Sequence, residues 1–192
     1  TANGVVKKVA IDAFQNVRAS GLIAITLKGD DQLKWVSATS GKDQIMMVSS
    51  DGSSVRFKES DVRPMGRTAA GVIGMRLHAG PDKSGRGADK NTPKNNKAVS
   101  GQAKVVGMEI ISSAVSEKDL KLLVVMENGY GKRTELKHYK VQKRGGKGIL
   151  TAKITAKTGN IVSANVTDPE CKEIIAVSQK GVVIRTSLES VS

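Results

Sequence analysis

Aromatic residues and cysteine are scarce in this chain of 192 residues. Only 3% of the residues are aromatic, and Cys171 is the single cysteine. Proteins that bind single-stranded nucleic acids stack the bases on exposed aromatic rings, so this composition argues against that class. One cysteine forms no disulfide within a chain, and with only two His it builds neither a zinc site nor a redox pair. We therefore expect no metal site and a reducing compartment, the cytoplasm.

Long apolar runs are also missing. The longest, such as residues 122–126, are far below the roughly 20 residues that cross a bilayer, so we expect no membrane span. Positive charge, in contrast, is abundant: 31 Lys and Arg against 18 Asp and Glu give a formal net charge of +13. Such an excess indicates a polyanionic partner, which is a nucleic acid, an acidic protein or an anionic membrane surface. A duplex phosphate backbone needs cations but no rings, and it fits this composition best.

A repeat with a period near 50 residues runs through the chain. Its markers are four glycines at spacings of 48, 77 and 52, each followed four places later by a basic residue and ten places later by an apolar or aromatic one. The glycines are Gly4, Gly52, Gly129 and Gly181; the basic residues are Lys8, Arg56, Arg133 and Arg185; the third set is Phe14, Val62, Tyr139 and Val191. Self-similarity at this period is typical of propellers and related radial folds.

The one long spacing has a visible cause in residues 80–103, which are rich in Gly, Pro, Ser, Asn and Lys. A segment with so few apolar residues buries too little surface to offset the entropy of ordering it, so we expect a mobile loop insertion. It carries a net charge of +3, leaving +10 on the rest of the chain. The basic residues of the insertion are Lys83, Arg86, Lys90, Lys94 and Lys97.

Short runs rich in Val and Ile, such as residues 21–27, 105–111 and 161–166, predict antiparallel strands. The dipeptides Asp51-Gly52, Asn128-Gly129 and Lys180-Gly181 predict hairpin turns between them. No sustained helical stripe is present, so the predicted fold is all-β. We expect one domain, 1–192, of about four antiparallel four-stranded blades. Their approximate bounds are 1–45, 46–122, 123–172 and 173–192, the last truncated or completed by strand exchange.

The strongest local motif is QKRGGKG, in which three cations and three glycines fall within seven residues. Glycines let the main chain approach a phosphate closely, Lys supplies charge, and Arg engages two oxygens at once, so the motif suits a phosphate clamp. A glycine-rich surface turn with solvated cations is the alternative that the residues leave open. The motif consists of Gln142, Lys143, Arg144, Gly145, Gly146, Lys147 and Gly148.

Repeated basic positions would place cations at intervals around one rim of a radial array. Neighbours on a strand point to opposite faces, so one member of each adjacent pair is expected to reach DNA. Each residue has a simpler alternative, a solvated surface cation. The candidates are Lys7, Lys8, Arg56, Lys58, Lys132, Arg133 and Arg185. Arg63 and Arg67 stand at the second module's counterpart of the glycine-rich motif, and Arg18 stands at the first module's.

The motif resembles the basic heptapeptide box of the A chain of DNA gyrase. Further stretches look like the C-terminal domain of that gyrase chain: NGYGKRT at 128–134, RFKESDVR at 56–63, MGRTAAGV at 65–72, NVR at 16–18 and GLIAI at 21–25. The resemblance implies a β-pinwheel, a six-bladed propeller-like array whose blades exchange strands and whose basic rim bends duplex DNA. Because the box lies in the third of four modules, it implies a secondary box in a chain that lacks the first two blades. The insertion is not a feature of the family.

The resemblance also implies a biological setting. The domain would wrap double-stranded DNA without reading sequence, and the parent type II topoisomerase would introduce negative supercoils. Its partners would be gyrase B and the remainder of gyrase A, in an A2B2 complex in the bacterial cytoplasm at the nucleoid. We expect no cofactor in this chain, with ATP and Mg bound elsewhere in the parent. The alternatives are the C-terminal domain of topoisomerase IV, which lacks a good box, and a propeller platform for an acidic protein.

Catalytic motifs are not found, so we expect a domain that is not itself an enzyme. The phosphate-binding loop motif of ATP-hydrolysing proteins is absent. His78 and His138 have no evident carboxylate or serine partner, and surface or edge positions are expected for both. In the family the nucleophilic tyrosine belongs to the N-terminal domain, so we interpret Tyr130 and Tyr139 as packing residues.

Overall fold

The computed structural model describes residues 1–78 and 102–191. Antiparallel strands and short 3-10 helices make up its regular structure, with no α-helix in these two ranges, so the all-β prediction is confirmed. The strands are β1 (Val5–Val6), β2 (Gln44–Ser49), β3 (Ser53–Lys58), β4 (Val72–Ile73), β5 (Val105–Ile111), β6 (Lys121–Met126), β7 (Gly131–Glu135), β8 (Ile149–Leu150), β9 (Ile161–Thr167), β10 (Glu173–Val177) and β11 (Val183–Ser187). The 3-10 helices are η1 (Ile11–Phe14), η2 (Glu59–Asp61), η3 (Glu117–Asp119), η4 (Leu136–His138) and η5 (Leu188–Ser190).

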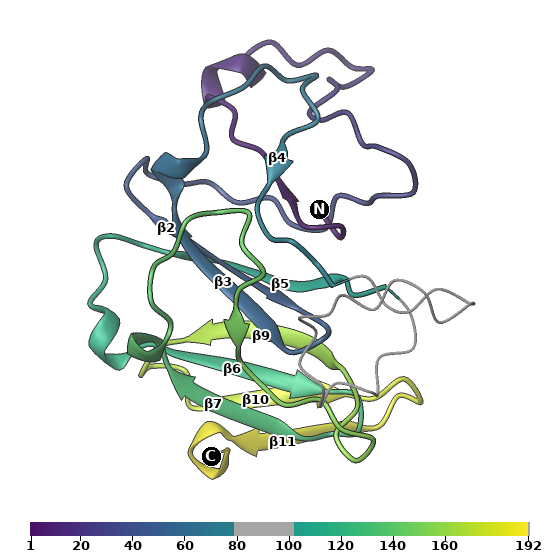
Figure 1. Ribbon diagram of the computed structural model, residues 1–192, viewed down its shortest axis with the longest axis vertical. Helices are drawn as coiled ribbons and strands as arrows, with labels where there is room; N and C mark the ends of the chain where they lie inside the picture. Colours follow the sequence, from purple (N-terminus) through teal and green to yellow (C-terminus); the bar gives the residue numbers. More distant parts are fainter. Residues whose placement is uncertain (79–101, 192) are drawn as a thin grey trace.

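The strands form four sheets, which we name blades A to D in chain order. Blade A is β1-β4, blade B is β5-β2-β3-β8, blade C is β7-β6-β9, and blade D is β10-β11. Figure 1 shows them following one another from the N-terminal end, at the top, to the C-terminal end at the bottom. Within the described residues only blade B has the four strands expected of every blade.

Strand exchange joins one blade to the next. After the hairpin β2-β3 of blade B, the chain supplies β4 to blade A, where Val5 pairs with Ile73, and then returns with β5 beside β2. The following module repeats this path: after β6-β7, strand β8 pairs with β3 of blade B through Ser54 and Ile149, and β9 returns beside β6. The predicted segment bounds therefore do not enclose complete sheets, because each of blades A and B takes a strand from the next segment.

The four repeat glycines occupy the same backbone position. Each donates its N–H to the carbonyl three residues earlier, at 3.2 Å for Gly4, 3.1 Å for Gly52, 3.0 Å for Gly129 and 2.9 Å for Gly181. Their φ angles are 83°, 91°, 80° and 79°, a left-handed conformation that favours glycine. A tight turn followed by a left-handed glycine suits a hairpin loop. The repeat and its three predicted hairpin turns are thus present in the structure.

Both faces of blade B are buried. Along β2, Ile45 and Met47 belong to one apolar cluster with Val55 and Phe57, while Met46 and Val48 belong to a second cluster with residues of blade C. Val6 and Val72 of blade A pack against the first cluster. Alternation along a strand sends successive side chains to opposite faces, so one strand serves two junctions. Blade B is therefore held between blades A and C.

The predicted strand at residues 21–27 does not form. Its counterparts in later modules are β4 and β8, which pair with the preceding blade, and the described residues include no blade before blade A. Instead Thr26 bonds to a loop, its N–H lying 3.4 Å from Ala69 O and its hydroxyl 2.6 Å from Thr68 O. The strands predicted at 105–111 and 161–166 are confirmed as β5 and β9.

The predicted insertion, 80–103, lies outside the described residues up to position 101. Its cations Lys83, Arg86, Lys90, Lys94 and Lys97, and its expected mobility, therefore stay predictions. At its far end the prediction is wrong, because Ala103 is buried, with 1% of its surface exposed. The packed body of the domain thus resumes before residue 104.

Candidate nucleic-acid interface

Two of the repeated basic residues, Arg56 and Lys8, were candidates for the outward-facing rim, but their side chains do not face outward. Arg56, on β3, is 3% exposed, and its Nη2 lies 2.5 Å from Glu117 Oε1 in η3, as an ion pair. Lys8 lies one blade earlier, with its Nζ 2.6 Å from Glu59 Oε1 in η2. Both side chains reach the 3-10 helices of the next module, because the second strand of each hairpin borders that module. They join blades, which removes Arg56 in particular from the expected DNA-facing rim.

Lys7 is also turned inward. Its Nζ donates to Ala24 O at 2.7 Å and to Arg67 O, so the amine joins two loops at the edge of blade A. Partial burial lowers the pKa of Lys7 from its ordinary value. Neither member of the adjacent pair Lys7 and Lys8 is therefore a simple solvated cation, although one of the two was expected to point outward.

The remaining rim candidates differ in exposure. Lys58 is exposed at the end of β3. Lys132 is exposed, with its Nζ 3.4 Å from Thr151 O, whereas its neighbour Arg133 is half-buried and has a buried Nε without a hydrogen-bond partner. Arg185 is 70% exposed and pairs with Glu173 across its own hairpin. The alternation expected of adjacent residues is seen for Lys132 and Arg133.

The glycine-rich motif, which we call the box loop (residues 142–148), lies along the edge of blade B. It begins where Gln142 N–H donates to Arg56 O at 2.7 Å, and it ends where Gly148 meets β3. Between these points Gly145 N–H donates to Gly74 O at 2.6 Å, on the segment after β4. A Cβ on Gly148, whose φ is 82°, would lie 2.2 Å from Ser54 O, so the close approach requires glycine there.

The cations of the box loop have different surroundings. Arg144 is anchored, with its Nε 2.8 Å from Asp61 O and its Nη1 3.0 Å from Ile73 O. Lys143 is 91% exposed and touches the protein only lightly, its Nζ lying 3.2 Å from Asp61 Oδ1. Lys147 is half-buried. Arg144 therefore holds the loop to blades A and B, while Lys143 is presented to solvent.

Residues 63–67, which we call the counterpart loop, meet blade A one module earlier; the repeat places Met65 at the position of Gln142 and Arg63 at the position of Lys140. Met65 N–H donates to Lys8 O at 2.9 Å, matching the bond from Gln142 to Arg56 at the equivalent repeat position. Arg63 is exposed and Arg67 is half-buried. Arg18, the first module's candidate, is exposed in a loop. Two successive modules thus carry exposed cations where the chain meets the edge of the preceding blade: Arg63 and Lys140 at the same repeat position, and Lys143 in the box loop.

Buried carboxylates support the junction between blades A and B. Burial alone would raise the pKa of Glu59, but hydrogen bonds from Lys8, Thr39 and Gly41, with the charge of Lys8, hold it below its ordinary value. Backbone N–H groups of Ser40 and Ser113, together with the Ser40 hydroxyl, lower the pKa of Asp43 to about 2. Both groups are therefore ionised at neutral pH and fix the chain around the start of β2.

Sequence reasoning missed two residues of this surface. Asp61, at the end of η2, holds Lys143 through its carboxylate and Arg144 through its carbonyl. Lys140 is exposed two residues before the box loop and adds a further cation to that edge. A signal for Lys140 was available, since it continues the basic run, but nothing in the local pattern indicates that Asp61 lies against a loop more than 80 residues away.

The residues considered for catalysis have structural surroundings. His78 was expected to lack a carboxylate partner, but its Nδ1 lies 2.5 Å from Asp51 Oδ2 at the β2-β3 turn. His138 is 62% exposed. Tyr139 is buried, as expected of a packing residue, whereas Tyr130 is 41% exposed and the Nζ of Lys157 lies 5.4 Å from its ring centre. No group of three or more His, Cys, Asp or Glu suited to a metal occurs in the two described ranges.

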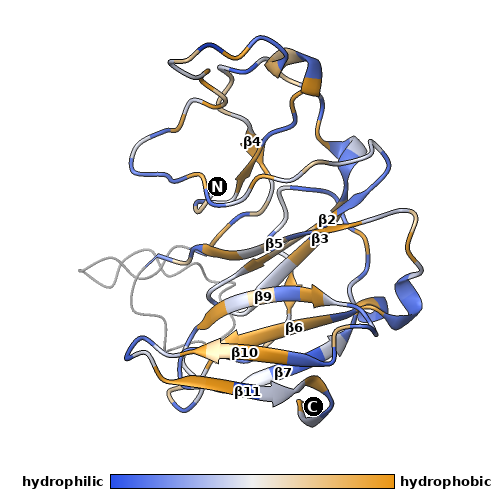
Figure 2. Cartoon of the chain, turned by 180° about the vertical axis from the view of Figure 1, so that it is seen from behind, coloured by the Kyte–Doolittle hydropathy of each residue, from blue (hydrophilic) through white to orange (hydrophobic). Residues whose placement is uncertain are grey.

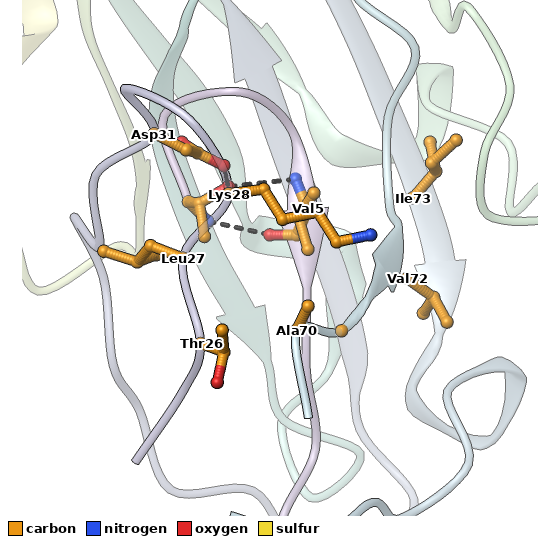
Figure 3. A pocket seen from close by; sticks show the side chains of 10 residues that line it. Val5, Thr26, Leu27, Lys28, Asp31, Ala70, Val72 and Ile73 are labelled. Atoms are coloured by element: carbon orange, nitrogen blue, oxygen red, sulfur yellow. Dashed lines mark hydrogen bonds between the residues drawn. The ribbon is translucent and has the colours of Figure 1, made fainter. Parts of the chain in front are cut away.

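A cavity of about 270 Å³ opens between blade A and the loop around residues 26–31 (Figure 3). Val5, Leu27 and Val72 give it an apolar lining, with Lys28 and Asp31 at its margin. Asp31 accepts a hydrogen bond from the hydroxyl of Thr1 at 2.7 Å and thereby ties the segment before β1 to the loop opposite.

Among the described residues, no helix is both long and apolar enough to cross a bilayer.

Comparison with known proteins agrees with the resemblance seen in the sequence. A family model described as the DNA gyrase C-terminal domain, beta-propeller, matches residues 1–40, 43–83, 121–168 and 172–192. The chain belongs to the DNA gyrase C-terminal domain family. The box loop lies inside the third matched segment, and residues 84–120 lie outside all four.

Relatives and solved structures point the same way. The chain is 38% identical over 192 residues to the gyrase A protein of Staphylococcus epidermidis (strain ATCC 12228 / FDA PCI 1200), and 38% identical over 193 residues to that of Staphylococcus aureus (strain MRSA252). All of the chain aligns in both cases, but it spans only 19% of each relative's length.

Among solved structures, the topoisomerase IV C-terminal domain matches with a TM-score of 0.77 at 23% identity, covering 100% of this chain and 51% of that one. The DNA gyrase A C-terminal domain matches with a TM-score of 0.69 at 26% identity, covering 98% and 54%. The first likeness shows the fold alone. Together with the family model they confirm the propeller-like arrangement of blades.

Proposed function

We infer that this chain binds duplex DNA through its phosphate backbone and bends it along successive blades. The observation that carries the proposal is that the counterpart loop and the box loop each bond to the preceding blade at the same repeat position, and that exposed cations, Arg63 and Lys143, lie beside those bonds. Cations repeated along a curved array follow a curved backbone. The formal net charge of +13 and the family membership support the same conclusion.

Backbone contact alone accounts for binding without sequence reading. Smooth bending over 20–30 base pairs costs on the order of 1–6 kcal/mol, which many phosphate contacts on a rigid surface offset. Each neutralised phosphate releases counterions, so the affinity falls steeply as salt rises. The chain contributes positioned charge rather than chemistry, and we expect no cofactor in it.

The wider role follows from the relatives, of which this chain spans about one fifth. We assign the domain to a gyrase A protein that works with gyrase B in an A2B2 complex in the bacterial cytoplasm, where ATP and Mg bound elsewhere drive negative supercoiling. A domain of topoisomerase IV is the second candidate, since the solved C-terminal domain of that enzyme has the same fold, with a TM-score of 0.77. The 38% identity to gyrase A over the whole chain supports the first assignment.

The decisive experiment measures linking number. Closed circular DNA is relaxed by a topoisomerase while the chain is bound, the protein is removed, and the topoisomers are counted. A change in linking number that grows with bound protein is expected of a bent, wrapped path. Tight binding with no change would contradict bending and leave a straight contact, while a failure to bind DNA would favour an acidic protein as partner.

Lys143→Ala tests the box loop through the salt dependence of duplex binding. Removing one phosphate contact lowers the slope of log K against log salt by about 0.9, which corresponds to about an eightfold loss of affinity at 0.1 M salt if the contact contributes nothing at 1 M. Lys153→Ala is the matched control. It removes the same charge from an exposed residue beside Ala152, at the turn end of the β2-β3 hairpin. Equal losses from both variants would contradict a specific role for the box loop.

A further inference from the structure

Arg56 makes contacts that converge on the segment leading into the box loop. Its Nη1 donates to Leu136 O at 3.3 Å and to Tyr139 O at 3.1 Å, at either end of the η4 turn. Its own carbonyl accepts the N–H of Gln142, the first residue of the box loop, at 2.7 Å. One buried residue thus holds positions 136, 139 and 142, and Lys143 follows directly.

The other side of the guanidinium is fixed as well. Nε donates to Gln44 Oε1 at 2.8 Å, on the neighbouring strand β2, and Nη2 pairs with Glu117. The hydrogen bond and charge of Arg56 hold the pKa of Glu117 below its ordinary value. A planar guanidinium with five N–H donors spans carbonyls and a carboxylate together, which a lysine ammonium on a flexible stem does not.

The same two-part contact recurs at the preceding junction. Lys8 stands at the repeat position equivalent to Arg56, its side chain pairs with Glu59 in η2, and its carbonyl accepts the N–H of Met65 in the counterpart loop. In both modules, then, the basic residue four places after the repeat glycine contacts a 3-10 helix through its side chain and a loop through its carbonyl. Because this two-part contact occurs at two junctions, we interpret it as a feature of the repeat rather than of one site.

We propose that Arg56 is a positioning residue for DNA binding, which holds the box loop so that Lys143 reaches the phosphate backbone while Arg56 itself does not touch DNA. The inference rests on the proposed function and names how its surface is kept in place. Without the side chain, residues 136 and 139 lose their bonds to β3, and of the contacts made by Arg56 only the main-chain bond of Gln142 remains. Arg144 and Gly145 still hold the far part of the loop, but the lead-in to Lys143 loosens, so its phosphate contact is lost with its charge intact.

The test is a double-mutant cycle read out as the salt dependence of duplex binding. Wild type, Arg56→Gln, Lys143→Ala and the double variant are titrated with one duplex at several salt concentrations. Arg56→Gln is expected to reduce the slope by about the same 0.9 as Lys143→Ala, and the double variant by no more than either alone. Arg56→Lys, which keeps the charge and one donor group, is expected to fall between wild type and Arg56→Gln.

A merely structural role would not move this slope. Leu188→Ala is the control, because Leu188 is fully buried in η5, outside the box loop and its lead-in. It lowers stability and the active fraction but should leave the slope at the wild-type value. Hydrogen exchange of residues 142–148 should rise in Arg56→Gln and stay unchanged in Leu188→Ala.

The outcomes are distinguishable. A wild-type slope in Arg56→Gln, or a double variant whose loss is the sum of the two single losses, overturns the positioning role. If Arg56→Gln does not fold, the decision passes to Arg56→Lys, where a wild-type slope and unchanged exchange in the box loop overturn it equally. If the wild-type chain itself fails to bind duplex DNA, it is the proposed function that is wrong, and this result says nothing against the role of Arg56 in holding the box loop.

Discussion

Blades B and D are built from the same repeat and differ in almost every measure of burial. Val55 stands three places after Gly52 and is fully buried, whereas Ile184 stands three places after Gly181 and is 58% exposed. Arg56 and Arg185 show the same contrast, at 3% and 70%. Figure 2 shows hydrophobic residues along β10 and β11, and Ile175, Val177, Val183 and Ile184 are each more than half exposed.

This difference shows that the repeat specifies where a hairpin forms but not whether the hairpin is buried in a core. Blade B is complete because β8 arrives from the following module and blades A and C cover its two faces. In arrays of this kind, stability is the sum of weak modules and strong contacts between neighbours. Identical local patterns therefore give a buried strand in the middle and an exposed one at a free edge.

The largest expected effect comes from the basic residue of the repeat. Arg56→Ala leaves the buried carbonyls of Leu136 and Tyr139 without their donor, whereas Glu117 is 41% exposed and stays solvated, so the change should cost about 2–6 kcal/mol of unfolding free energy. Arg185→Ala breaks an exposed pair with Glu173 and should cost about 0–1 kcal/mol. Urea unfolding of the two variants measures the contrast. Similar losses would show that burial in blade B does not set the value of this position.

The turn glycines sharpen the comparison at a smaller scale. Ala at position 181 meets open space, so only its left-handed φ is unfavourable, by about 1–2 kcal/mol. Ala at position 52 has the same strain and also places a Cβ 2.1 Å from Ala152 O, so about 2–5 kcal/mol is expected. The melting temperatures of Gly52→Ala and Gly181→Ala measure the difference. A larger loss from Gly181→Ala would mean that strand exchange leaves more room at Gly52 than the structure shows.

The smallest effect is expected in acid, below about pH 4. The pKa of Asp43 is lowered to about 2 in the folded chain, below its ordinary value of 3.8, so its stabilising contribution is complete above about pH 4 and is lost as the pH falls toward 2. In blade D the repeat position equivalent to Asp43, nine places before Gly181, is occupied by Lys172, which is a base rather than a carboxylate. Stability of wild type should decline through this window, and Asp43→Asn should show a flatter decline. Parallel curves would contradict the assignment to Asp43.

Much of the fold could be predicted because its signals are local. Hairpin turns need a left-handed glycine, and the runs at 105–111 and 161–166 carry β-branched residues in the lengths of strands. The pairing of β3 with β8 has no local signal, since a two-residue strand gains its place only from a partner nearly a hundred residues earlier. The prediction failed at 21–27 for the same reason, because that run is strand-like in sequence but no strand among the described residues pairs with it.

The candidate site likewise has parts with a local signal in the sequence and parts without one. The box loop was identified from composition, since clustered glycines and cations are themselves the signal. The inward direction of Arg56 and Lys8 could not be predicted, because a strand cation looks the same in sequence whether it meets solvent or the carboxylate of the next blade. Charge density indicates that a surface binds an anion, but the neighbouring module decides which cations belong to that surface.

Strand exchange also sets an order of events during synthesis. Ser54 pairs with Ile149, which is synthesised 95 residues later, so the edge of β3 stays unpaired until then. At about 5–20 residues per second, a ribosome needs on the order of 5–20 s to make that length, and throughout this time β3 presents an open edge of the kind that pairs with other chains. The same connection that locks the finished array thus makes each blade dependent on the translation of its successor.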